Sequence, residues 1–103
     1  MRQFDVFRNP SIRSRSIYPL VVVLQSHLME ASNMTVVAPV IPQDYRSTFT
    51  QFSTVVTLAD QEVIVLVNEL GAVETRLLQR SIGNLTDFED EIRRAIDRLF
   101  TGF

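Results

Sequence analysis

One stretch of helical periodicity, at residues 85–103, limits what the rest of this chain can fold into. Apolar residues recur there at the spacing of a single helix face: Phe88, Ile92, Ala95, Ile96, Leu99 and Phe103. The stretch then ends in Phe100-Thr101-Gly102-Phe103, without a polar tail. Because chain ends are usually frayed and wet, we expect this apolar end either to pack into the core or to face a partner.

The charges of the same stretch support a C-terminal helix. Thr86 and Glu89 have the spacing of a capping box, in which each side chain bonds a backbone N–H at the helix start. Acidic residues come first and arginines last, an order that suits the helix dipole. We predict i,i+4 ion pairs from Glu89 to Arg93 and from Asp90 to Arg94.

Before this helix, short apolar stretches alternate with turn residues. We predict strands at residues 3–8, 17–25, 34–41, 53–58, 62–68 and 73–82. The fifth is apolar on both faces, which indicates a central strand. Pro39 and Pro42 predict that the end of the third lies at a sheet edge or a turn. Many short strands followed by one helix favour a small, partly closed barrel that the helix covers.

Three connections separate these strands. Residues 9–16 hold Pro10, three serines and two arginines, which predicts a solvated, mobile hairpin tip rather than a specific anion site. Residues 26–33 include the adjacent apolar pair Leu28 and Met29, which must dip into the core or join an exposed patch. Residues 43–52 are polar and predict a loop.

Composition bounds the class of protein. A chain of 103 residues with 46% apolar and 21% charged residues is predicted to be one globular domain, whose modest core a homodimer would supplement. The net charge of −2 gives no global attraction to nucleic acid. No apolar run is long enough for a signal peptide or a membrane span, so we expect no membrane association and a cytoplasmic location.

The residues needed for catalysis or metal binding are scarce. There is no cysteine and one histidine, His27, which excludes thiolate chemistry and makes a transition-metal site improbable. The three glycines are isolated, so no phosphate-binding loop is present. We predict no catalytic residue, no metal and no cofactor, and a surface that binds another protein.

Four segments, in the same order, resemble the CcdB toxins of bacterial toxin–antitoxin modules. They are Gln3-Phe4-Asp5-Val6, YPLVVVLQS at 18–26, VAPV at 37–40 and EIRRAIDRLFTGF at 91–103. The resemblance runs over the full length. It implies a mainly β fold, an SH3-like barrel with a small second sheet and a C-terminal α-helix, assembled as a homodimer. It also implies a non-enzymatic toxin that binds the A subunit of DNA gyrase and traps the gyrase–DNA cleavage complex. A CcdA-type antitoxin would neutralise it, and operator DNA would be bound only through the toxin–antitoxin complex.

The resemblance carries over a gyrase-binding set, position by position. It comprises Gln3, Phe4, Ser26, Leu28, Met29, Asp97, Thr101, Gly102 and Phe103. Thr101 stands where the archetypal member has tryptophan, and Asp97 stands where it has asparagine. Because threonine cannot stack on an arginine as tryptophan does, gyrase poisoning is expected to be weaker, to use another anchor such as Phe103, or to be lost.

Two other functions stay open. One is an RNA-cleaving toxin of the MazF type, which shares the barrel, and the other is a non-toxic antitoxin-binding homologue. RNA cleavage needs a convergent base, acid and phosphate-binding arginine. The single histidine and the net charge of −2 make it the lesser interpretation.

Overall fold

The computed structural model describes residues 1–26, 32–43 and 52–102. The strands and the α-helix in these residues are β1 (Asp5–Arg8), β2 (Leu20–Val23), β3 (Met34–Pro42), β4 (Ser53–Leu58), β5 (Gln61–Leu66), β6 (Gly71–Glu74), β7 (Gly83–Asn84) and α1 (Glu89–Thr101). Short 3-10 helices lie at Val67–Glu69, Thr75–Leu77 and Thr86–Phe88. The predicted connections at residues 26–33 and 43–52 therefore fall largely outside the described residues, as do Leu28, Met29 and Phe103.

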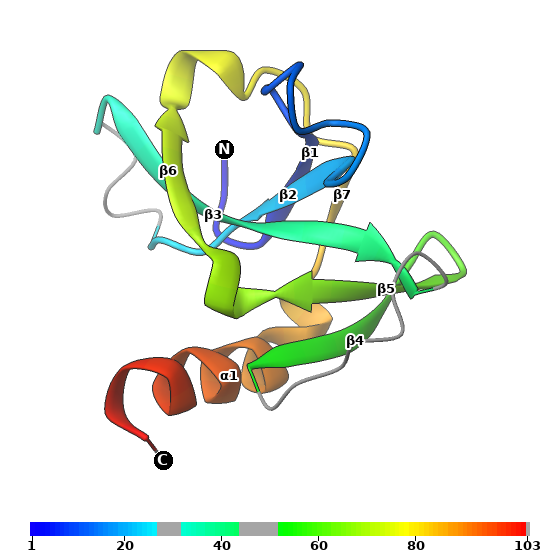
Figure 1. The fold of residues 1–103 in the computed structure, drawn as a ribbon, viewed down its shortest axis with the longest axis vertical. Helices are drawn as coiled ribbons and strands as arrows, with labels where there is room; N and C mark the ends of the chain where they lie inside the picture. Colours follow the sequence, from blue (N-terminus) through cyan, green and yellow to red (C-terminus); the bar gives the residue numbers. More distant parts are fainter. Residues whose placement is uncertain (27–31, 44–51, 103) are drawn as a thin grey trace.

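The described strands form one antiparallel sheet in the order β4-β5-β3-β2-β1-β7, and β6 pairs with the first half of β3. Figure 1 shows that this sheet curls, with α1 lying beneath β4 and β5. The mainly β, barrel-like fold with a C-terminal helix is therefore confirmed. The short strand β6 branches from β3 within the same sheet, where a separate small sheet was expected.

The main core lies between the curled sheet and α1. Alternation along the strands fills it: Phe4 and Val6 point into it, whereas Phe7 points to the opposite face. Ile92 and Ala95 close it from the helix side and are fully buried. Its buried members are Phe4, Val6, Val22, Leu24, Ala38, Val40, Val56, Val63, Val65, Val67, Leu85, Ile92 and Ala95. The predicted helix face is confirmed for the residues that the structure describes.

Two smaller clusters lie on the other side of the strands. Leu78 and the partly buried Val73 pack against the residues of β1 to β3 that point away from α1. Ile64 and Leu66 form the other cluster with Ile41. Strand β5 thus buries both faces between β4 and β3, and the prediction of a central strand is confirmed.

The prolines of β3 lie where one side of the strand has no partner. The prediction of an edge position holds at Pro42 but not at Pro39, because β2 pairs with one side of β3 only as far as Val40, while β6 and then β5 pair with the other side as far as Pro42. Val36 directs its N–H to the β2 side, where a glutamine side chain accepts it at 2.9 Å. N–H direction alternates along a strand, so the nitrogen of Pro39 faces the opposite side. It falls there between the last β6 pair, at Val37, and the first β5 pair, at Val40.

The predicted strand at residues 73–82 is mostly wrong. A 3-10 helix at Thr75–Leu77 ends β6, and the chain pairs again only at β7. The Thr75 hydroxyl donates to Ser32 O at 2.8 Å and lies 2.7 Å from Thr35 Oγ1. These bonds anchor the turn, which directs Leu78 into the second cluster.

The β1–β2 loop is held by internal hydrogen bonds, in contrast to the mobile tip that was predicted. Asn9 is only 5% exposed. Its amide donates to Ser14 Oγ at 2.9 Å and to Tyr18 O at 2.7 Å, and its Oδ1 accepts from Ser11 N at 3.0 Å. Arg15 Nε donates to Asn9 O at 2.8 Å. A single buried amide therefore organises the loop.

The start of α1 also differs from the prediction. A 3-10 helix at Thr86–Phe88 precedes α1, and neither helix has a side-chain cap, so the capping box is absent. Asn84 Oδ1 instead accepts the N–H of Thr86 at 2.8 Å. Asn84 also donates to Asp5 Oδ1 at 2.9 Å, which ties this entry to β1. The backbone N–H at this start is thus satisfied by a side chain two positions before the expected cap residue Thr86.

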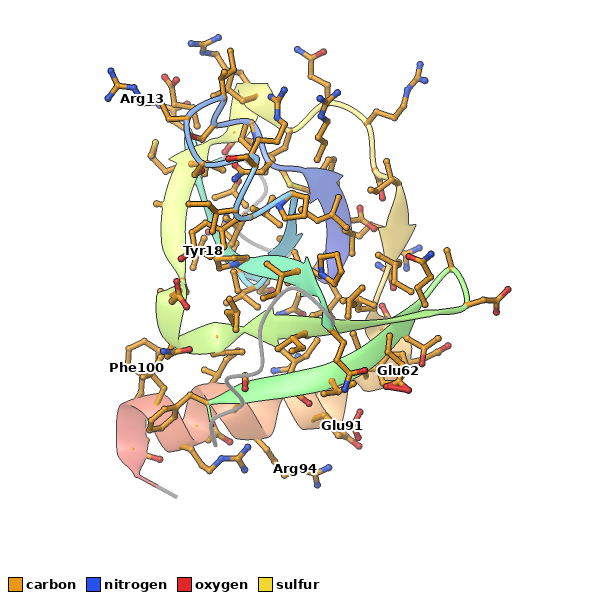
Figure 2. All side chains as sticks on the ribbon, turned by 45° about the vertical axis from the view of Figure 1, so that its right-hand side comes forward. Arg13, Tyr18, Glu62, Glu91, Arg94 and Phe100 are labelled. Atoms are coloured by element: carbon orange, nitrogen blue, oxygen red, sulfur yellow. The ribbon has the colours of Figure 1, made fainter. Side chains whose placement is uncertain are left out.

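Of the two predicted ion pairs on α1, one forms. Arg93 Nε lies 2.7 Å from Glu89 Oε2. Arg94 instead pairs with Glu91, three residues before it, at 3.5 Å. The predicted partner, Asp90, lies four residues before it. Figure 2 shows Arg94 and Glu91 on the outer side of the helix.

Candidate functional site

The N-terminal turn is the first part of the candidate site. Asp5 N donates to Arg2 O at 3.1 Å, and Arg2 N donates to Asp5 Oδ2 at 2.8 Å. Phe4 has a φ of 69°, which a bulky residue rarely adopts. Its N–H donates to Val23 O at 2.8 Å, and its carbonyl accepts from Leu85 N at 2.9 Å. The turn is thus fixed by β2 and by the entry to α1, and it buries the Phe4 ring at 2% exposure.

Gln3 connects two elements that are distant in sequence. Its Nε2 donates to Leu24 O at 2.8 Å, and its Oε1 accepts from Arg93 Nη2 at 3.4 Å. The guanidinium of Arg93 also lies 5.8 Å from the centroid of the Phe4 ring. This Gln3–Arg93 link holds the end of β2, which leads to Ser26, against the helix that carries Asp97.

The predicted residues at the N-terminus therefore differ in position: some lie at the surface and one lies in the core. Gln3 and the half-buried Ser26 line one shallow pocket, so these two predicted residues lie together. Phe4 lies beneath this surface, in the core, and any effect it has on binding would pass through its neighbours. The positions of Leu28 and Met29 lie outside the described residues.

The end of α1 is the second part of the candidate site. Asp97, Thr101 and Gly102 are exposed. Thr101 Oγ1 donates back to Asp97 O at 2.6 Å, so its hydroxyl is engaged within the helix. Gly102 ends the helix with a φ of 81° and donates its N–H to Arg98 O at 3.1 Å. Its left-handed conformation is the reason that glycine suits this position.

Sequence reasoning missed two residues of this region. Phe100 is 67% exposed at the end of α1, where Figure 2 shows it beside the last turn. It falls outside the apolar spacing of the helix, which could have identified it as a surface aromatic. Arg93 was predicted only as the partner of Glu89. Its contacts with Gln3 and Phe4 span about 90 positions and leave no local signal.

No metal-binding group of side chains forms in the described residues. No cluster of three or more histidine and carboxylate side chains suitable for a metal occurs there. His27 lies outside the described residues. None of the helices in the described part of the chain is long and apolar enough to cross a membrane.

The fold is similar to those of two mycobacterial toxins and a mycobacterial endoribonuclease. An Mtb toxin is 20% identical over 79% of this chain and 91% of that chain, with a TM-score of 0.67. The Mycobacterium tuberculosis toxin MazF-mt6 is 20% identical over 79% of this chain and 84% of its own, also with a TM-score of 0.67. An endoribonuclease from a mycobacterial species is 9% identical over 96% of this chain and 89% of its own, with a TM-score of 0.75. At these identities the likeness concerns the fold.

A search of curated proteins found no match. The family model described as CcdB protein, however, matches residues 3–102. That range includes both the N-terminal turn and α1 with its glycine cap. The chain therefore belongs to the CcdB family of toxin–antitoxin proteins.

Proposed function

We propose that this protein is a non-enzymatic toxin that binds the A subunit of DNA gyrase and traps the gyrase–DNA cleavage complex. The observation that carries the proposal is the family match over residues 3–102. The exposed end of α1 supports it, because Asp97, Phe100, Thr101 and Gly102 present a polar and aromatic surface next to one another.

Phe100 is the residue that we propose as the anchor on gyrase. Thr101 occupies the position of the family tryptophan and uses its hydroxyl on Asp97 O, so it offers no aromatic face. Phe100 is the adjacent residue, and most of its side chain is free of intramolecular contact at 67% exposure. Exposed aromatic residues frequently carry most of the energy of an interface. Phe103 remains a proposed second anchor, together with Leu28 and Met29.

We further propose that the Gln3–Arg93 link positions this surface. It joins the strand end before Ser26 to α1 by one glutamine side chain. Loss of the link would let these two segments shift relative to each other. Gln3 would then affect gyrase binding chiefly through geometry, and Phe4 would do so through the packing beneath it.

The partners and setting follow from the same proposal. We propose a homodimer of this single domain, neutralised by a CcdA-type antitoxin in the cytoplasm, where gyrase acts. Sedimentation at micromolar concentration should give about twice the chain mass of 11.8 kDa. A monomer under those conditions would refute the dimer.

The test is binding to an immobilised gyrase A fragment, combined with supercoiling and cleavage assays. Phe100→Ala should weaken binding by about tenfold or more, as expected for an interface anchor. Ile82→Ala is the matched control, because Ile82 is also a largely exposed apolar residue, at 53%, and belongs to none of the proposed contacts. Deletion of residues 101–103 should abolish binding with little change in the thermal melt, because Ile92 and Ala95 keep the core closed.

Two results would overturn the proposal. One is unchanged gyrase affinity in both the Phe100→Ala and the truncated protein. The other is cleavage of RNA by the purified protein without any effect on gyrase, which would favour the MazF-type alternative that the shared fold leaves open.

A further inference from the structure

The positive charge of this chain is unevenly distributed in the folded protein. Five of its arginines lie in two segments, residues 8–19 and 75–86, neither of which contains a carboxylate. These arginines are Arg8, Arg13, Arg15, Arg76 and Arg80. The net charge of −2 for the whole chain conceals this separation.

The fold brings the two segments to the same end of the molecule. Ile82 N donates to Val6 O at 2.8 Å, and Leu78 packs in one apolar cluster with Phe7. The second segment therefore runs beside β1, from which the first segment continues. Figure 1 shows the loop after β1 and the chain between β6 and β7 at the end of the molecule opposite α1, whereas the remainder of the second segment descends from β7 toward α1. Figure 2 shows Arg13 pointing outward at that end. We call this surface the basic end.

Most of the charge at the basic end is not neutralised within the protein. Arg8, Arg13 and Arg80 are exposed and form no ion pair with any described residue. Arg76 pairs with Glu74 at 3.2 Å in an exposed contact, and such contacts contribute little. The opposite end carries both signs, because α1 holds four carboxylates and three arginines, and Arg93 and Arg94 pair there with Glu89 and Glu91. The surplus of unpaired positive charge therefore lies at the basic end.

We propose that the basic end binds the phosphate backbone of duplex DNA directly, without an antitoxin. Arginine forks match phosphate oxygens in a bidentate manner. The exposed hydroxyls of Ser11, Ser16 and Ser81 lie in the same segments, and serine is a common phosphate contact. Contacts of this kind bind without reading sequence.

The side chains of the basic end favour duplex DNA over single strands. Recognition of single-stranded RNA or DNA relies on exposed aromatic side chains on which bases stack. The one aromatic residue in the two segments is Tyr18, which is half-buried and donates its hydroxyl to Glu69 Oε1 at 2.5 Å. The basic end therefore offers charge, hydroxyls and the exposed aliphatic side chains of Ile12, Ile17, Leu77 and Ile82, but no exposed aromatic residue on which a base could stack.

Fluorescence anisotropy with the full chain and a labelled random duplex of about 20 base pairs tests the proposal. With four phosphates contacted, raising the salt from about 50 to 200 mM should weaken binding by about 150-fold. Arg13→Ser with Arg80→Ser should weaken binding at low salt by at least about tenfold and lower the salt slope by about two. Neither side chain forms an ion pair with any residue that the structure describes, so the fold should be preserved.

Arg94→Glu is the control matched for charge, because it changes the net charge by the same amount at the opposite end. Screening should limit its effect to about threefold. The proposal is overturned if the duplex does not bind at low salt, or if the two variants behave alike. It is also overturned if single-stranded RNA or a labelled polyglutamate peptide binds this end in preference to the duplex. None of these results depends on gyrase.

Discussion

Replacing Asn9 with alanine should unfold the protein at a much lower temperature, although Asn9 lies in a surface loop. Three hydrogen bonds of its side chain would be lost, at 2.7, 2.9 and 3.0 Å. At roughly 1 kcal/mol for each bond, the free energy of unfolding should fall by about 2–3 kcal/mol. For a domain of this size that corresponds to about 10–20 °C in the thermal midpoint.

A thermal melt followed by circular dichroism measures this change. Arg13→Ala is the control, because Arg13 is exposed in the same loop and has no partner among the described residues, so its midpoint should move by less than about 3 °C. Asn9→Asp keeps the acceptor for Ser11 N but loses both donated bonds. Its thermal midpoint should therefore lie between those of the Asn9→Ala and Arg13→Ala variants. Equal midpoints for the alanine variants of Asn9 and Arg13 would refute the reasoning, and the loop would then be the solvated, mobile tip predicted from the sequence.

Three further changes probe the helix and its link to the N-terminus. Arg93→Ala should lower the free energy of unfolding by about 1–1.5 kcal/mol, because the Glu89 ion pair and the contact with the Phe4 ring are lost. Arg94→Ala should lower it by under about 0.5 kcal/mol. Equal losses for the two variants in urea unfolding would exclude a stabilising link. Gly102→Ala should destabilise the last helical turn by about 1 kcal/mol, because a φ of 81° strains any residue with a Cβ. A clash would not contribute, since nothing lies within 4 Å of the added Cβ. Unchanged amide hydrogen exchange at the end of α1 would contradict this prediction. Ile92→Ala should cost about 2–5 kcal/mol at a fully buried site, and a smaller loss in the same unfolding assay would mean that the core under α1 collapses around the gap.

Sequence reasoning was most reliable where a pattern is local and repeats. The spacing of Ile92, Ala95 and Ile96 identified the buried face of α1, because side chains three and four apart share one side of a helix. The alternation in β5 identified a strand buried on both faces for the same kind of reason. The collinear segments that resemble CcdB toxins identified the family that the match over residues 3–102 shows.

It failed where partners come from distant positions. Pro39 suggested an edge, yet β3 is central, because two different strands share one of its sides and leave a gap at that residue. Thr86 and Glu89 fit a capping box, but Asn84 accepts the N–H of Thr86. Local preferences of about 1 kcal/mol are readily overridden by the packing of neighbouring elements.

By itself, the sequence determined the one C-terminal helix and the two-faced strands, because each of these depends on residues close together in the chain. It also identified the family, through four segments that occur in the same order along the chain. Only the tertiary structure decided that Gln3 links the end of β2 to Arg93. It alone also joined the two arginine segments into one basic end, which a net charge of −2 does not suggest. Hydrogen bonds and electric fields act across space, so which side chains they connect is set by strand pairing and not by position in the sequence.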